Sequence, residues 1–319
     1  MNCLRILTLW PIRAKLLLLI LIAVMSAFGA VIRSYILERR HEIETAEHSS
    51  LLLVRSLAAQ QKEIEISTKE VLGELAQSPE VQTLDVRECN DLLRKLNFRY
   101  PYYSILGALT PDGNLFASSV QFGPGIVNIS DQKHLNDAIR SQDFSAGEYS
   151  VGRVTGVQTI HYAYPALDSR KHLIAVVTAG FKLDMYAGYV AKANLPLDSV
   201  VVITDSRGIR LYRSPKSEAA VLGQSIPSQE FEHMSGNLDE GSFEGIASDG
   251  NYRINAFKRL CLKEGSSPYL YMTVGIVKNK LLKNANFIFS SSLLFLGLAG
   301  FAILAIVWIF PVSPRKPAS

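Results

Sequence analysis

The chain has 319 residues, of which 48% are apolar, and this length is sufficient for about two domains. Its 33 lysines and arginines exceed its 29 acidic residues by four. These basic residues are scattered along the chain instead of forming one basic face, so we expect no nucleic-acid partner.

Two uncharged apolar runs lie near the ends of the chain, at residues 16–32 and 287–310. Each reaches the roughly 17 to 25 residues with which a helix crosses a bilayer. We therefore expect transmembrane helices at 16–34 and 287–310. The chain would then be anchored in the inner (plasma) membrane, with the segment between the helices forming a periplasmic or extracellular domain.

The flanks of the first run allow two interpretations. Basic residues before an apolar core also resemble a secretory signal, with a small-x-small cleavage site at residues 27–29. Because the apolar run continues past that site into a helical pattern, we favour an uncleaved anchor. Basic residues are also present in the short tail, so the positive-inside rule places residues 1–15 and 311–319 in the cytoplasm.

Residues 35–79 are expected to form one long signalling helix that leaves the membrane. The segment contains good helix formers, and Ser78-Pro79 should end it. A rough heptad seam is formed by Ile36, Ile43, Leu57, Ile64 and Val71. Polar residues such as Gln61 interrupt this seam, which favours packing against the domain, with a partial homodimer contact, over an extended coiled coil.

Residues 80–193 are predicted to form a membrane-distal subdomain. It begins with an amphipathic helix at 86–98, and a second short helix should start after Ser130 or Asp131, either of which could be the N-cap. The turn at 111–114 has the composition of a hairpin turn. An antiparallel sheet flanked by helices would contain strands at 104–109, 115–119, 147–154, 158–167 and 172–183.

Residues 194–277 are predicted to form a membrane-proximal subdomain that repeats the same order more weakly. A polar loop is expected around Pro215 and Pro227. The candidate strands are 199–204, 209–212, 241–246, 252–260 and 269–276. Residues 278–286 would connect this subdomain to the second span, and the tail beyond residue 310 is too short for a folded output domain.

Several segments together carry a resemblance to a known family. In the distal subdomain they are LTPDG (109–113), ASS (117–119), ISDQKHL (129–135), GEYSVGRVTG (147–156), AYP (163–165) and KLD (182–184). In the proximal subdomain they are VITDSRG (202–208) and LGQS (222–225). On these motifs the chain resembles the double Cache family of bacterial extracytoplasmic sensor domains, found in histidine kinases, diguanylate cyclases and chemoreceptors.

The resemblance covers roughly residues 35–276 and implies an α+β fold. A long N-terminal helix would be followed by two tandem PAS-like subdomains with antiparallel sheets, and two transmembrane helices would flank them. The family often has Asp-Arg-x-Tyr/His-Phe where this chain has Asp131-Gln132-Lys133-His134-Leu135. The missing arginine and aromatic residue leave the identity of the ligand open.

The resemblance implies a small-molecule pocket in the distal subdomain, between its sheet and the segment around Asp131. Arg153 at a hairpin tip could clamp a carboxylate, and a helix N-terminus could help to hold an anion. Alternation places His161 on one face of its strand and two neighbouring tyrosines on the other, so either set could face the ligand or the core. The candidate ligand-binding residues are Asp131, His134, Tyr149, Arg153, Tyr162, Tyr164 and Tyr103.

Enzymatic and metal-binding functions find no support in the sequence. Nucleophile-elbow, zinc-protease, P-loop and dinucleotide motifs are absent, and the six histidines lack metal-ligand spacing. Cys3, Cys89 and Cys261 lie far apart, so we expect neither a structural disulfide nor a zinc site. We expect no catalytic residues, no metal and no cofactor.

The sequence therefore predicts a membrane-anchored sensor of a small solute such as a carboxylate or an amino acid. Its signal would pass through the membrane helices to a separate signalling partner. The alternatives are a structural or interaction protein that docks an extracytoplasmic partner, and a truncated, non-signalling receptor.

Overall fold

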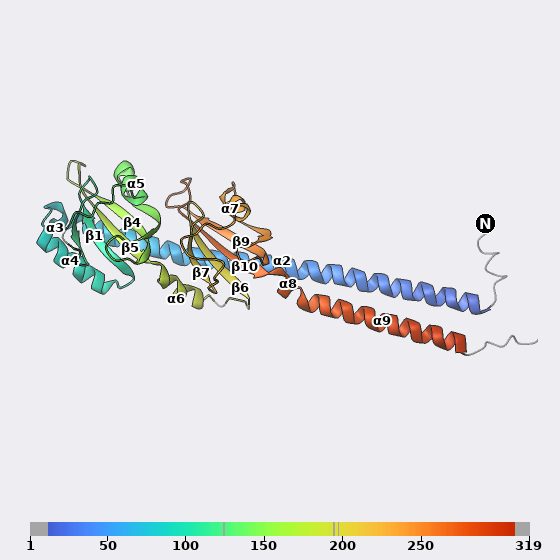
Figure 1. Cartoon of the computed structure of the whole chain (residues 1–319). Coiled ribbons are helices and arrows are strands. Elements are labelled where there is room, and N and C mark those ends of the chain that lie inside the picture. Colours follow the sequence, from blue (N-terminus) through green and yellow to red (C-terminus); the bar gives the residue numbers. More distant parts are fainter. Residues whose placement is uncertain (1–11, 124, 194, 197, 310–319) are drawn as a thin grey trace, which may run out of the picture. The chain divides into compact units, whose positions relative to one another are not determined.

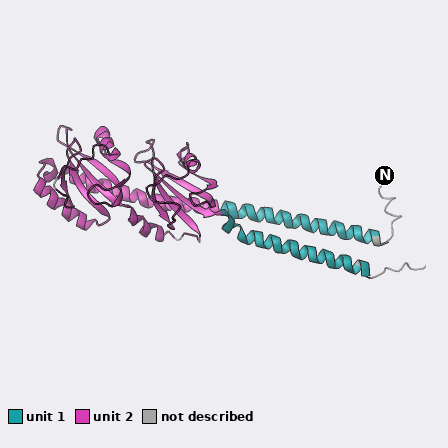
Figure 2. Cartoon of the chain, viewed as in Figure 1, with its two compact units in different colours: residues 1–45, 278–319 teal, residues 46–277 magenta. Residues whose placement is uncertain are grey.

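The computed structural model describes residues 12–123, 125–193, 195–196 and 198–309. The expected cytoplasmic N-terminus lies almost wholly outside the described residues, as do Cys3 and the tail 311–319. The chain divides into two compact units, residues 1–45 with 278–319 and residues 46–277 (Figure 2).

The first unit is helical. It contains the first part of α2 (Ile12–Gln77), then α8 (Lys278–Leu281) and α9 (Lys283–Ile309). By length and composition, α2 and α9 could each cross a membrane. The predicted first span and signalling helix are one continuous helix, since no proline interrupts residues 12–77.

The end of α2 follows the predicted signal. Ser78 has an extended backbone, and its side chain caps the next helix, α3 (Pro79–Gln82), by accepting a hydrogen bond from the amide of Val81. Asp85 then caps α4 (Val86–Arg99), which buries Cys89 and Leu93. A proline at the first helical position and two capping side chains thus set these boundaries.

The second unit contains two five-stranded antiparallel sheets with the same topology (Figure 1). The distal sheet has the order β2-β1-β5-β4-β3. Its strands are β1 (Tyr103–Leu109), β2 (Leu115–Ser118), β3 (Ser145–Val151), β4 (Gln158–Leu167) and β5 (Leu173–Lys182).

The proximal sheet repeats this arrangement with the order β7-β6-β10-β9-β8. Its strands are β6 (Ser199–Asp205), β7 (Arg210–Ser214), β8 (Glu240–Ile246), β9 (Tyr252–Leu260) and β10 (Leu270–Val277). The predicted tandem of two PAS-like subdomains after a long helix is therefore confirmed.

Each sheet has a helix-α2 face and an opposite face. Apolar side chains of α2, such as Val54 and Leu72, pack with Tyr162 of the distal sheet and Val274 of the proximal sheet in one continuous core. The opposite faces carry α5 (Lys133–Ser141) in the distal subdomain and α7 (Ser228–Ser235) in the proximal one (Figure 1). Strand alternation thus sends one set of side chains to α2 and the other to a shorter helix.

Gln61 lies where α2 passes both sheets and is buried. Its Nε2 donates hydrogen bonds to the hydroxyls of Tyr162, at 2.9 Å, and Tyr269, at 3.2 Å. Tyr186 donates to its Oε1 at 2.8 Å. The residue that interrupts the heptad seam therefore joins α2 to the two subdomains, as expected if the helix packs against the domain.

Three local predictions were wrong or incomplete. The loop expected around Pro227 contains helix α7, and the segment between the two sheets contains η1 (Leu183–Met185) and α6 (Tyr186–Ala191). Gln132, not Ser130 or Asp131, occupies the N-cap position of α5, and its side chain makes no capping bond within the described residues. Asp131 is therefore available for a different partner.

Candidate functional site

A cavity of about 50 Å³ lies on the α5 side of the distal sheet. Ile105, Leu109, Leu115, Val127 and Ile129 provide most of its apolar wall, and the tip of the β3–β4 hairpin closes one side. His161 of β4 and Thr178 of β5 supply polar groups from the sheet. A mostly apolar hollow with a few polar groups is the usual form of a small-molecule site.

Two histidines stack behind this cavity. The rings of His134, from α5, and His161 lie with their centroids 5.1 Å apart and 15° from parallel. His161 Nδ1 lies 3.0 Å from the hydroxyl of Ser150 and 3.3 Å from that of Thr159. His134 Nε2 is buried and has no hydrogen-bond partner among the described residues.

Burial keeps both imidazoles neutral. Desolvation lowers the pKa of His161 to about 4 and holds the pKa of His134 well below its usual value, the second shift being reinforced by His161 itself. A neutral imidazole carries one donor and one acceptor. The pair can therefore offer hydrogen bonds to a solute without adding charge at neutral pH.

Two glycines make room for the histidine pair. A Cβ on Gly147 would lie 3.1 Å from His134 Nδ1, and one on Gly180 would lie 3.0 Å from His161 Nε2 and 2.8 Å from Ser104 Oγ. In the β4–β5 register, Gly180 stands directly opposite His161. Glycine at these positions of β3 and β5 therefore leaves space for the two imidazole rings, because a larger residue would displace the rings.

Arg153 and Asp131 form a clasp at the edge of the cavity. Arg153 lines the cavity, and its Nη2 donates to Asp131 Oδ2 at 2.5 Å, while its Nη1 donates to the carbonyl of Asn128. Arg153 lowers the pKa of the Asp131 carboxyl. Both side chains are substantially exposed, so this pair links the β3–β4 hairpin to the loop before α5 at little energetic cost.

The structure brings three of the seven predicted site residues, Asp131, His134 and Arg153, to this region. Tyr103 and Tyr162 are buried on the α2 face, where Tyr103 donates a hydrogen bond to Thr68 at 2.9 Å. Tyr164 also packs against the α2-side core.

Tyr149 lies at the boundary between the subdomains. Its amide donates to Asp205 at 3.1 Å, and its ring lies so close to Gly223 that a Cβ there would be 2.8 Å from the ring. A role for any of the seven in ligand binding remains a prediction.

Most of the cavity walls are residues that the sequence does not single out as ligand-binding. Alternation separates His161 from the tyrosines of its strand but does not say which of the two sets faces α2. The signal for its side was present in Thr178-Ala179-Gly180, because a glycine opposite a large side chain indicates close approach of a neighbour.

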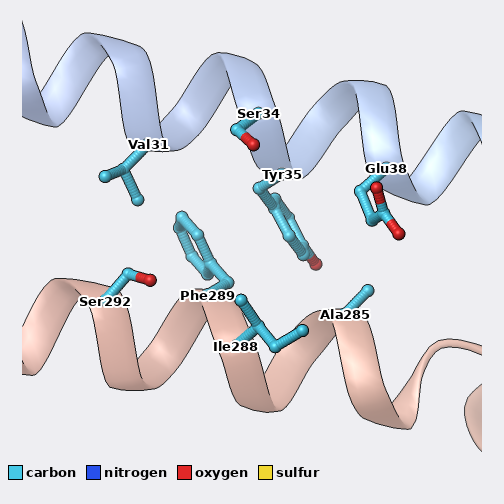
Figure 3. Close-up of a pocket in the computed structure, with 8 residues that line it drawn as sticks. All are labelled: Val31, Ser34, Tyr35, Glu38, Ala285, Ile288, Phe289 and Ser292. Carbon is cyan, nitrogen blue, oxygen red and sulfur yellow. The ribbon is translucent and has the colours of Figure 1, made fainter.

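Three of the hollows among the described residues are larger than this cavity, and one of them, of about 280 Å³, lies between α2 and the side chains of Tyr102 and Tyr189. Two others are lined by different parts of the chain. One, of about 280 Å³, lies in the helical unit between α2 and α9 (Figure 3). There Tyr35 stacks on Phe289, with centroids 4.2 Å apart, and donates to Asn286 at 2.7 Å. These contacts join the two helices, so we regard this hollow as part of helix packing. Aromatic residues at such positions are also typical of a bilayer interface.

The other, of about 440 Å³, lies between the subdomains. Its walls include Lys133, Asp137 and Arg140 of α5 and Lys263 of the β9–β10 connection. Lys133 and Arg140 are both paired with Asp137, and Lys263 is paired with Asp143. Its charges are therefore satisfied within the protein, unlike the buried His134 nitrogen.

Metal and disulfide chemistry find no site in the part of the chain that the structure describes. No group of three or more His, Cys, Asp or Glu side chains there could hold a metal ion. Cys89 is buried and Cys261 is half-buried, and both are free. Burial raises the pKa of Cys89 to about 11, so its thiol is a poor nucleophile.

Comparisons with protein-family models and with curated proteins found no match. Among solved structures, the periplasmic sensory domain of the Campylobacter jejuni chemoreceptor Tlp1 is similar, with 14% identity and a TM-score of 0.55. The comparison covers 76% of this chain and 98% of that domain.

Two further structures are ligand-binding domains of chemoreceptors. CtaA of Pseudomonas fluorescens, in complex with L-isoleucine, has 14% identity and a TM-score of 0.55 over 77% of this chain and 96% of that one. PctB of Pseudomonas aeruginosa, in complex with L-Arg, has 14% identity and a TM-score of 0.56 over 73% and 94%. The chain therefore has the fold of these domains, the tandem double-Cache arrangement that its sequence predicted.

Proposed function

We propose that this protein is a membrane-anchored, non-enzymatic sensor whose distal subdomain binds a small solute, such as a carboxylate or an amino acid. The observation that carries the proposal is the His134–His161 pair, buried behind a cavity whose edge is held by the Arg153–Asp131 clasp. The likeness to ligand-binding domains of chemoreceptors supports it at the level of fold.

Binding would require the clasp to open. Ligand sites usually have volumes of roughly 300–1,000 Å³, well above the 50 Å³ of this cavity. Arg153 would exchange Asp131 for an acidic group of the solute, and the hairpin tip would move outward. Since the Arg153–Asp131 pair is exposed, its opening costs about 0–1 kcal/mol.

Strand β4 provides a route from the cavity to α2. His161 faces the cavity and the adjacent Tyr162 faces α2, where its hydroxyl accepts from Gln61. A shift of β4 on binding would change this contact. The ligand would shift the populations of the two arrangements of β4 only as far as its affinities for them differ. Hydrogen exchange of residues 57–65 with and without ligand tests the step, and identical exchange would contradict it.

In this proposal the two helices span the inner membrane, with the subdomains on the periplasmic or extracellular side and both ends of the chain in the cytoplasm. The signal would pass to a separate partner, and α2 would contribute a partial homodimer contact. The variant Ser169→Cys, in the β4–β5 turn, tests the orientation. If the subdomains lie outside the cytoplasm, the new thiol should react with a membrane-impermeant reagent added to intact cells.

The experiment for binding is thermal unfolding of the full chain in detergent micelles against carboxylates, amino acids, amines and purines. A ligand selective for the native state raises the midpoint saturably. We expect one chemical class to do so, and Arg153→Gln to lose the rise. The matched control is Arg170→Gln, since Arg170 is an exposed turn arginine of the same subdomain.

Cooperative unfolding without any shift across the panel would contradict sensing by this cavity and favour the docking of an extracytoplasmic partner. If the ligand-induced rise of the midpoint persisted in Arg153→Gln and disappeared in Arg170→Gln, the binding site would not be at the clasp.

A further inference from the structure

The proximal subdomain has a cavity at the position that corresponds to the distal one. In the distal sheet, Ala163 and His161 pair with Thr178 and Gly180. In the proximal sheet, Phe257 and Asn255 pair with Thr273 and Gly275 in the same register. A Cβ on Gly275 would lie 2.3 Å from Asn255 Oδ1, as one on Gly180 would meet His161.

The walls at these equivalent positions differ in charge. Leu115 at the start of β2 pairs with Leu109, and Arg210 at the start of β7 pairs with Thr204, so Leu115 and Arg210 occupy equivalent positions. Thr159 corresponds to Arg253 by the shared register. Arg210, Arg213 and Arg253 all line the proximal cavity together with Glu230 of α7.

These guanidinium groups are deeply buried. The exposed fractions are 2% for Arg210, 7% for Arg213 and 3% for Arg253. Asp249 receives two hydrogen bonds from Arg253, both at 2.6 Å, and one from Arg213 at 2.7 Å. Arg210 instead donates to neutral oxygens, the carbonyl of Val221 and the hydroxyl of Ser248.

The cluster is not neutralised by the carboxylates around it. Counted over the described residues that line the cavity, with Asp249 behind them, three arginines face two carboxylates. Burial raises the pKa of Glu230, which weakens its contribution, whereas arginine stays charged at any ordinary pH. A buried charge without compensation is costly, because the protein interior solvates it poorly.

The cluster also has donors to spare. The Nε–H groups of Arg210 and Arg253 are buried and lack an acceptor within the residues that the structure describes. The cavity between them has a volume of about 20 Å³, enough for one body of the size of a water molecule. The geometry therefore fits an ion of that size and is too small for an amino acid.

We propose that the proximal subdomain binds a small monovalent inorganic anion, of the size of chloride, between Arg210 and Arg253. The ion would accept hydrogen bonds from the two Nε–H groups and neutralise the excess positive charge. It would stabilise the native proximal subdomain and would be independent of any solute in the distal cavity.

The test uses the full chain in detergent micelles at constant ionic strength, with sodium chloride replacing sodium gluconate, whose anion is too large for the cavity. At chloride tenfold above its dissociation constant, we expect the unfolding midpoint to rise by about 3 to 6 °C. Arg210→Gln should abolish the rise. Arg259→Gln, a change on the same strand β9 but outside the cavity, should retain it.

A second measurement does not depend on any variant folding. Chloride-35 resonance lines should broaden in the presence of wild-type protein, and an excess of bromide should reverse the broadening. Equal midpoints in chloride and gluconate, together with no broadening, would overturn the proposal and leave a buried water molecule as the occupant. Chloride dependence that survives Arg210→Gln and is lost in Arg259→Gln would overturn the assignment to this cavity.

Discussion

The distal and proximal subdomains have the same strand order and the same threonine–glycine pair on their central strand, yet opposite chemistry on the face away from α2. The distal face has an apolar cavity with two neutral histidines. The proximal face has three buried arginines and two carboxylates. One fold therefore carries two chemically different cavities, because strand alternation fixes which positions face the cavity but not which residues occupy them.

The two cavities also differ in how they are enclosed. An exposed ion pair, Arg153–Asp131, lies at the edge of the distal cavity, and little free energy is needed to open it. The arginines of the proximal cluster are buried, and Arg253 is paired with Asp249. We therefore expect changes in the proximal cluster to affect stability, and changes at the distal clasp to affect binding.

The largest expected effect is that of Asp249→Asn. This change leaves the guanidinium groups of Arg213 and Arg253 buried without their carboxylate, which should cost about 3–5 kcal/mol of unfolding free energy. Urea unfolding of the full chain measures it. The control Asp239→Asn, whose side chain is 80% exposed beside Arg259, should stay within about 0.5 kcal/mol. Equal losses in the two variants would refute the role of the proximal cluster.

The glycine pair tests whether the two sheets are built alike. Gly180→Ala and Gly275→Ala each force a Cβ against a neighbouring side chain, so each should destabilise by about 1–3 kcal/mol. Gly188→Ala, in α6, is the control, because its Cβ meets nothing within 4 Å in the described structure. A loss at only one of the two strand positions would break the structural equivalence.

The histidine pair predicts a pH dependence specific to the distal subdomain. The folded pKa of His161, about 4, lies below the ordinary histidine pKa of 6.5, so the unfolded chain binds more protons and stability falls as pH drops below 6.5. His161 keeps part of its surface on the cavity, so we expect it to contribute about 1–2 kcal/mol of the loss between pH 7 and pH 5.

His161→Asn places the proximal residue at this position and should remove that part of the loss. The control is His48→Asn, a change at an exposed position of α2. Chemical unfolding at pH 5, 6 and 7 gives the comparison, and an unchanged slope in His161→Asn would show that the histidine does not titrate as proposed.

The smallest effect on stability is expected at the clasp. Asp131→Asn should cost less than about 1 kcal/mol, as for other exposed ion pairs. It should nevertheless change ligand affinity, because Arg153 has to leave residue 131 before it can pair with the acidic group of the solute. Calorimetric titration with the solute found in the thermal screen checks this, with Asp91→Asn, which breaks the surface pair with Arg94, as control. Identical affinity in wild type and Asp131→Asn would remove Asp131 from the site.

Much of the fold was predictable from local sequence. The apolar runs, the stop at Ser78-Pro79 and the hairpin turn at 111–114 each depend on residues that are close in sequence. Strand positions followed from alternation. Helix α7 was missed because Pro227 and a polar composition masked a short amphipathic turn in which only Glu230 and Met234 are buried.

The candidate site was less predictable. Arg153 and Asp131 were chosen for their chemistry, and the structure pairs them with each other. For Tyr162 and Tyr164, alternation defines two faces of the strand without saying which one α2 covers.

The sequence alone determined the order and type of the main elements and the two apolar helices, since these follow from composition and periodicity along the chain. The tandem double-Cache fold was implied by the resemblance that its motifs carry. Only the tertiary structure decided that α2 covers the Tyr162 face and leaves His161 on the cavity. It also gathered Arg210, Arg213, Glu230, Asp249 and Arg253 from separate segments into one buried cluster. The physical reason is that burial and charge compensation depend on contacts between residues far apart in sequence, which no local pattern encodes.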